Sequence, residues 1–99
     1  MTKLHENVLR AVKADLVKFI RPEAVCTSLE SAKVITTEEA NNIKIMKTKR
    51  ERVESLVDLI RAKPDAAFSG FIKALEKNEE TVAVHIIYKK LKGMQMLVT

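Results

Sequence analysis

The sequence predicts an all-α protein, a six-helix antiparallel bundle formed as one domain by 99 residues. Glycine and proline each occur only twice, and the remaining composition favours helix over sheet. Apolar residues recur at spacings of three and four, as on one face of a helix with 3.6 residues per turn. Pro22 and Pro64 fall between such segments, where proline ends one helix and suits the first turn of the next.

The stretch from Thr48 to Glu76 carries the clearest pattern, because two amphipathic segments follow each other directly. The first apolar set is Val53, Leu56, Val57 and Ile60, and the second is Phe68, Phe71, Ile72 and Leu75. The turn between them is Arg61-Ala62-Lys63-Pro64. We therefore expect a helical hairpin, with one helix opening at Thr48 and the next running from about Pro64 to Lys77.

Two helices are predicted before residue 34. Residues 3–20 place Leu4, Val8, Val12 and Leu16 four apart, which predicts one long helix. Pro22 opens a second helix, and Glu23 in its first turn suits the positive end of the helix dipole. This helix should end by Ser31 or Lys33.

Capping boxes predict the start of the third and fourth helices. In Thr36-Thr37-Glu38-Glu39 and in Thr48-Lys49-Arg50-Glu51, a threonine oxygen can accept from the N–H three residues on, while the glutamate reaches back. The third helix should turn three apolar residues inward, namely Ala40, Ile43 and Met46.

The sixth helix is predicted with Asn78 as its N-cap and Gly93 as its C-terminal stop. A strand is the alternative for Thr81 to Tyr88, because these residues are rich in β-branched side chains and partly alternate. We favour helix, since a lone strand would have no partner. The predicted domain then spans residues 1–93, and residues 94–99 form a flexible tail.

The few aromatic residues are expected to anchor the core; they are Phe19, Phe68, Phe71 and Tyr88. The single cysteine, Cys26, cannot form a disulfide within the chain and fits a reducing compartment. No apolar run approaches the roughly 20 residues that span a bilayer. We therefore expect a soluble, cytoplasmic protein without membrane contact.

Neither catalysis nor cofactor or metal binding is predicted. His5 and His85 lie far apart, and neither falls in a nucleophile motif. Cys26 is interpreted as a small half-buried residue. The two glycines form no phosphate-binding loop, and no ligand spacing indicates a metal.

Charge is distributed unevenly along the chain, whose net charge is +5. Residues 1–21 and 47–63 each carry +3, whereas residues 22–46 carry −2. The predicted first and fourth helices are therefore basic, and the second and third are acidic. If the first and fourth are neighbours, the molecule has a positive face and a negative face.

Two further explanations of the basic residues stay open. An isoelectric point near 9.5 fits a small helical nucleic-acid-binding domain. Against it, the turn at Lys63-Pro64 lacks the usual glycine of a helix-turn-helix, and the following helix has a net charge near zero. The other explanation is a helical bundle without self-association, whose basic surface only maintains solubility.

Three segments taken in order resemble the caspase recruitment domain family. Residues 52–60, RVESLVDLI, and 67–75, AFSGFIKAL, are similar to the family's fourth and fifth helices. Residues 34–39, VITTEE, resemble the entry into its third helix, and Thr48 and Arg50 match residues that open its fourth. The resemblance covers roughly residues 4–92.

The resemblance implies a six-helix death-fold bundle of Greek-key type. It also implies a non-enzymatic module that binds another domain of its kind in apoptotic or inflammatory, innate immune signalling, joining receptors, adaptors and caspases. Some members assemble into helical oligomers. The two charged faces would allow head-to-tail contact, which generates open helical assemblies when it does not close.

Two sets of residues are predicted to bind the partner domain. Lys13 and Arg50 come from the resemblance, and the others come from helix position and charge. The basic face comprises Arg10, Lys13, Lys18, Lys49, Arg50 and Arg52. The acidic face comprises Glu23, Glu30, Glu38 and Glu39.

Overall fold

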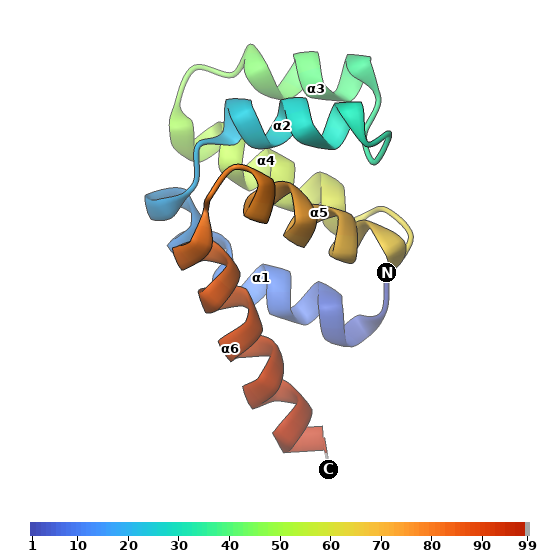
Figure 1. Ribbon diagram of the computed structural model, residues 1–99, viewed down its shortest axis with the longest axis vertical. Helices are drawn as coiled ribbons and strands as arrows, with labels where there is room; N and C mark the ends of the chain where they lie inside the picture. Colours follow the sequence, from blue (N-terminus) through green and yellow to red (C-terminus); the bar gives the residue numbers. More distant parts are fainter. Residues whose placement is uncertain (99) are drawn as a thin grey trace.

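The computed structural model describes residues 1–98, and this part of the chain forms six α-helices joined by short connections (Figure 1). The helices are α1 Lys3–Phe19, α2 Pro22–Ser31, α3 Thr37–Lys44, α4 Lys49–Arg61, α5 Ala66–Lys77 and α6 Thr81–Val98. The all-α prediction is confirmed. The alternative of a strand from Thr81 to Tyr88 is wrong, because these residues form the first half of α6.

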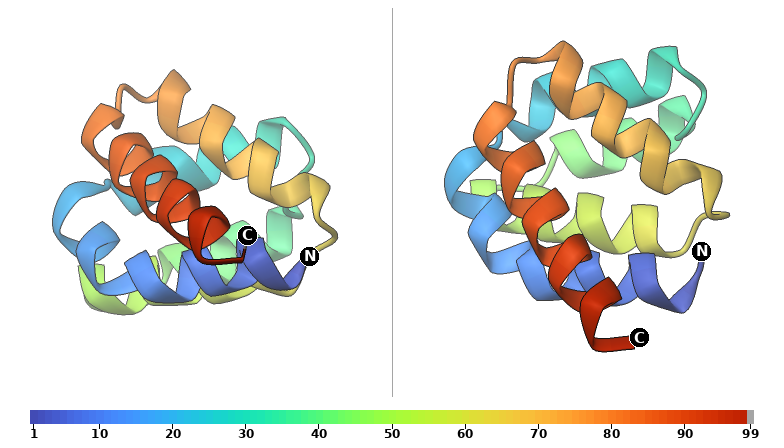
Figure 2. Two further views of the ribbon diagram at one scale, coloured as in Figure 1. Left: turned by 90° about the horizontal axis from the view of Figure 1, so that it is seen from below. Right: turned by 60° about the horizontal axis from the view of Figure 1, so that its bottom comes forward.

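The bundle is elongated, with extents of 41 × 25 × 21 Å. In Figure 1, α2 and α3 lie together at one end of the long axis, α1 lies toward the other end, and α4 and α5 lie between them. The first and fourth helices are neighbours, as the charge argument required. Helix α6 packs against α1 and then projects beyond it (Figures 1 and 2).

All six helices contribute side chains to one hydrophobic core. Its largest fully buried members are Phe71, Leu9, Leu16, Ile20, Leu29, Leu56, Ile60, Leu75 and Ile87. Of the four expected aromatic anchors, Phe68 and Phe71 are buried, whereas Phe19 is 46% exposed and Tyr88 is 47% exposed. Each outlier is adjacent in sequence to a buried isoleucine, and one residue rotates a side chain about 100° around a helix.

The two predicted capping boxes differ in detail. Thr36 accepts from the Glu39 N–H at 3.1 Å and donates its own N–H to the Glu39 carboxylate at 2.9 Å, which completes the box before α3. Thr48 accepts from the Glu51 N–H at 3.1 Å, but the Glu51 carboxylate accepts from the Thr48 hydroxyl instead of its N–H. Both threonines are N-caps, so both helix starts are confirmed.

Helices α2 and α5 end in the same way, with a residue in the left-handed conformation. These residues are Lys33, with φ of 61°, and Glu79, with φ of 59°. The N–H of the following residue donates to the carbonyl five residues earlier, Val34 to Leu29 and Glu80 to Leu75. Asn78 is therefore the C-cap of α5 and not the N-cap of α6, so that prediction is wrong.

The expected stop at Gly93 is also wrong, because α6 continues through it to Val98. Gly93 does not adopt a positive φ, so it does not provide the left-handed cap that ends many helices. Residues 94–98 extend the helix, and Thr99 lies outside the described residues. The domain boundary at residue 93 and a flexible tail stay predictions. At the other hairpin, α5 begins at Ala66 and not at Pro64.

Candidate interaction surface

Helices α1 and α4 run antiparallel, which brings basic residues from two distant segments onto one surface. Glu6 near the start of α1 pairs with Arg61 at the end of α4, and Lys13 farther along α1 pairs with Asp58. The C-terminal half of α1, with Lys18, therefore lies toward the start of α4, where Lys49 and Arg50 are found.

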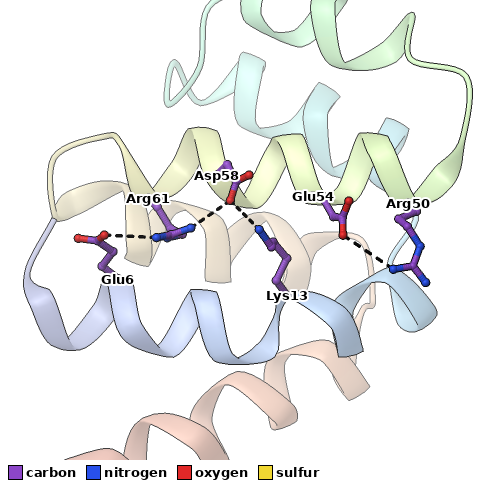
Figure 3. A network of polar contacts seen from close by, with 6 residues as sticks. All are labelled: Glu6, Lys13, Arg50, Glu54, Asp58 and Arg61. Atoms are coloured by element: carbon purple, nitrogen blue, oxygen red, sulfur yellow. Dashed lines mark hydrogen bonds and ion pairs between the residues drawn. The ribbon is translucent and has the colours of Figure 1, made fainter.

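A chain of ion pairs joins the two helices on this surface (Figure 3). Arg61 contacts Glu6 at 3.3 Å and Asp58 at 3.1 Å, and Lys13 contacts the same Asp58 oxygen, Oδ1, at 3.1 Å. One aspartate oxygen thus accepts from two cations on different helices. Lys13, which was predicted to face a partner, is already paired within its own molecule.

Of the predicted basic residues that form an ion pair, Arg50 has the most exposed side chain. Its guanidinium lies 3.9 Å from Glu54, one turn along α4, and 69% of its side chain is accessible. An exposed pair at this distance contributes little free energy. Arg50 can therefore leave Glu54 and contact another molecule at little cost.

Arg52 lies on a different side of α4. It donates to Glu23 of α2 at 3.0 Å, and only 26% of its side chain is exposed. This pair joins a residue of the predicted basic face to a residue of the predicted acidic face. The structure therefore does not bring Arg52 together with Lys13, which pairs on the α1 side of α4.

The other three predicted basic residues, Arg10, Lys18 and Lys49, are exposed. Arg10 donates to the side-chain oxygen of Asn7 at 3.2 Å, which leaves its charge uncompensated. None of the three has an ion pair within residues 1–98. Among the six predicted basic residues, these three and the weakly paired Arg50 are the accessible positive charges.

The predicted acidic residues lie on α2 and α3, which pack against each other. Glu23 pairs with Arg52, and Glu30 accepts from the Thr37 hydroxyl at 2.9 Å. Glu39 contacts Lys63 at 2.8 Å, and this hydrogen bond, followed by that of the Thr36 N–H, lowers the pKa of its carboxyl. Glu38 is exposed and has no ion pair in the described part of the chain.

Five residues of these pairs were not among the predicted site residues, namely Glu6, Glu54, Asp58, Arg61 and Lys63. The pairing of Asp58 with Arg61 could be predicted from their spacing, because residues three apart lie close together on the surface of a helix. The contacts of Lys13 with Asp58 and of Lys63 with Glu39 join different elements. No local spacing indicates those.

The groups considered for chemistry have other surroundings. Cys26 is fully buried, not half-buried as expected, and this burial raises the pKa of its thiol to about 11. His85 is exposed on α6. Residues 1–98 contain no group of three metal-ligating His, Cys, Asp or Glu side chains. In the same residues, no helix has both the length and the apolar character to cross a membrane.

Residues 6–86 match the family model described as the caspase recruitment domain. This span covers α2 to α5 completely, α1 from its fourth residue onward and the first part of α6. No curated protein matches the sequence.

Proposed function

This chain belongs to the caspase recruitment domain family, and we propose that it binds a second such domain through the two charged surfaces. Domains of this family are non-enzymatic protein–protein interaction modules of apoptotic and inflammatory signalling. In the proposed complex, basic residues of α1 and α4 pair with acidic residues of α2 and α3 of the partner. The family is typically cytoplasmic, and we propose the same compartment here.

The antiparallel packing of α1 on α4 is the observation that supports this proposal most. It gathers exposed cations from both helices, Arg10 and Lys18 from α1 and Lys49 and Arg50 from α4. The exposed Glu38 lies on the neighbouring pair of helices α2 and α3. Complementary charges of this kind determine encounter rate and partner choice more than affinity.

A first experiment reverses the charge of Arg50. Arg50→Glu should abolish capture of a partner caspase recruitment domain, while circular dichroism and the melting temperature stay unchanged because the Glu54 pair is weak. Lys73→Glu is the matched control, since Lys73 is an exposed lysine on α5 and the charge change is the same. Equal capture by wild type and Arg50→Glu would disprove the role of the basic surface.

Self-association is the finer part of the proposal. A contact between two different surfaces leaves one of each free on every dimer, so assembly continues into an open helical oligomer unless it closes. The apparent molar mass measured by light scattering should therefore rise with protein concentration. A bundle that does not self-associate would give a flat profile.

Head-to-tail assembly can be tested more directly with two variants, each of which loses one of the two charged surfaces. Arg50→Glu destroys the basic surface and keeps the acidic one, and Glu38→Lys does the reverse. Each variant alone should be monomeric, and an equimolar mixture should form a one-to-one complex that grows no further. Chromatography with light scattering measures both. Oligomers in either variant alone would contradict head-to-tail assembly.

The salt dependence of binding distinguishes the nucleic-acid alternative from the proposed binding of a partner domain. Phosphate contacts release counterions, so binding to a random duplex should fall steeply as salt rises. We expect no shift of such a duplex at low salt when the partner domain is bound in the same conditions. A salt-dependent shift that Arg50→Glu removes would favour the nucleic-acid alternative.

A further inference from the structure

The second half of α6 carries most of the protein's net charge. The family match ends at residue 86, whereas α6 continues to Val98 and projects past α1 (Figure 1). The first 80 residues hold 15 basic and 13 acidic side chains, a net charge of only +2. The remaining +3 comes from Lys89, Lys90 and Lys92, with no acidic residue in α6.

These three lysines differ from the paired cations of α1 and α4 and resemble the unpaired Arg10, Lys18 and Lys49. All three are exposed, and within residues 1–98 none of them pairs with a carboxylate. Lys13, Arg52 and Arg61 in contrast each have an acidic partner at 3.3 Å or less. Positive charge is therefore available on α6 without breaking an existing contact.

A groove lies beside these lysines, between α1 and α6. Its volume is about 650 Å³, and it is lined by Asp15, Ile86, Lys89, Lys90, Gly93 and Met94. Ile86 and Met94 are partly buried and pack against the core, so they give the groove an apolar floor. Gly93 leaves the groove open at its own position, because a Cβ added there would meet no atom within 4 Å.

We propose that this groove binds an acidic peptide segment of a partner protein. An apolar side chain of the segment enters beside Ile86 and Met94, and its carboxylates pair with Lys89 and Lys90. Asp15 on the opposite side accepts from backbone N–H groups of the segment. This surface lies on α6 and does not depend on the pairing proposed for α1 and α4.

The composition of the groove favours a peptide over a phosphate surface. A membrane or a nucleic acid would neutralise the lysines but leave the apolar floor unfilled. A peptide with one apolar anchor between glutamates complements both the lysines and the apolar floor.

Charge reversal on α6 tests the ionic part. The probe is a labelled, end-capped peptide with one leucine between glutamates, and binding is measured by fluorescence anisotropy. Lys89→Glu with Lys90→Glu should weaken binding by about tenfold. Lys73→Glu with Lys77→Glu is the matched control, because both residues are exposed on α5 and the total charge changes equally. Equal loss in both double variants would overturn the proposal.

Filling the groove tests the apolar part without changing any charge. Gly93→Leu should weaken probe binding by about tenfold, as should replacing the probe's leucine by serine. Gly93→Leu should not affect the capture of a partner caspase recruitment domain, which Arg50→Glu abolishes. Unchanged probe binding by Gly93→Leu, with circular dichroism showing an intact helix, would overturn the proposal.

Competing partners are tested with the same proteins. Phosphatidylserine vesicles and a random DNA duplex should bind more weakly than the peptide at matched charge concentration. Binding of either that is tighter than the peptide and is lost in the Lys89 and Lys90 double variant would also overturn the proposal. The surface would then recognise phosphate and not an acidic segment.

Discussion

Arg52 on α4 donates to Glu23 on α2 at 3.0 Å, so a residue predicted to bind a partner's acidic face instead contacts the acidic face of its own molecule. The pair holds α2 against α4 at the surface. Neither residue is fully available to another domain while this contact persists. It therefore limits the proposed interface to the remaining charges.

The strength of the Arg52–Glu23 pair can be measured by a double-mutant cycle. Arg52→Met and Glu23→Gln should each lower the free energy of unfolding slightly, with a coupling of about 0.2–1 kcal/mol, because half of the Glu23 side chain is exposed. Urea unfolding of the four proteins gives the value. A coupling well above 1 kcal/mol would mean that the pair is structural and cannot open for a partner.

The core should respond very differently at two phenylalanines. Phe71 is fully buried, so Phe71→Ala should lower the free energy of unfolding by about 3–5 kcal/mol. Phe19 is 46% exposed, and Phe19→Ala should cost clearly less. Chemical denaturation measures both. Similar losses at the two positions would place Phe19 in the core, contrary to the structure.

The two glycines should respond to alanine with opposite signs. Gly93→Ala meets no neighbour and should stabilise α6, by at most about 1 kcal/mol, because alanine favours helix more than glycine does. At Gly70 the new Cβ would lie 2.8 Å from the Val34 Cγ2 atom. Overpacking of this kind costs about 1–3 kcal/mol, so Gly70→Ala should destabilise the protein.

Shortening Val34 separates the contact from helix propensity. In a Val34→Ala background the clashing methyl is absent, so Gly70→Ala should become neutral or stabilising. Thermal unfolding of the single and double variants shows the change of sign. A loss that persists in the double variant would place its cause elsewhere than at Val34.

Acid should weaken the protein partly through Glu39. Hydrogen bonds from Lys63 and from the Thr36 N–H lower the pKa of its carboxyl in the folded state below the ordinary value of 4.5. A depressed pKa stabilises the fold above the unfolded value, and this contribution is lost as pH falls through the folded one. Stability should therefore decline below pH 4.5.

Replacing the carboxyl isolates its share of the acid effect. Glu39→Gln should be less stable at neutral pH and should lose less stability on acidification to about pH 3. Glu38→Gln is the control, because Glu38 is exposed and has no ion pair in the described residues. Urea midpoints at several pH values make the comparison. Parallel curves for wild type and Glu39→Gln would rule out a contribution from Glu39.

Local signals predicted most of the fold. The apolar spacing on either side of Lys63 and Pro64 located the central hairpin, and Thr36 and Thr48 located two helix starts. The errors arose at the end of α5 and in α6. Glu79, a non-glycine residue, takes the left-handed conformation that ends α5, so Asn78 could not serve as an N-cap for α6.

The charged surface was less predictable than the fold. Net charge by segment indicated which helices are basic, and their packing confirmed that α1 and α4 are neighbours. Sequence could not indicate that Lys13 meets Asp58 or that Arg52 meets Glu23, since these partners are 45 and 29 residues apart. Only the folded arrangement determines which cations stay available.

The shared oxygen of Asp58 determines how an acidic partner would meet this surface. A carboxylate that reaches Lys13 competes with Asp58 for its ammonium group, while Arg61 keeps that aspartate in place from the other side. Each such contact is an exchange of one carboxylate for another, so it gains little enthalpy and releases few ions. The side chains are already ordered, however, and little rotamer entropy is lost on docking. Affinity at this edge should therefore vary less with ionic strength than the net charge of the protein suggests.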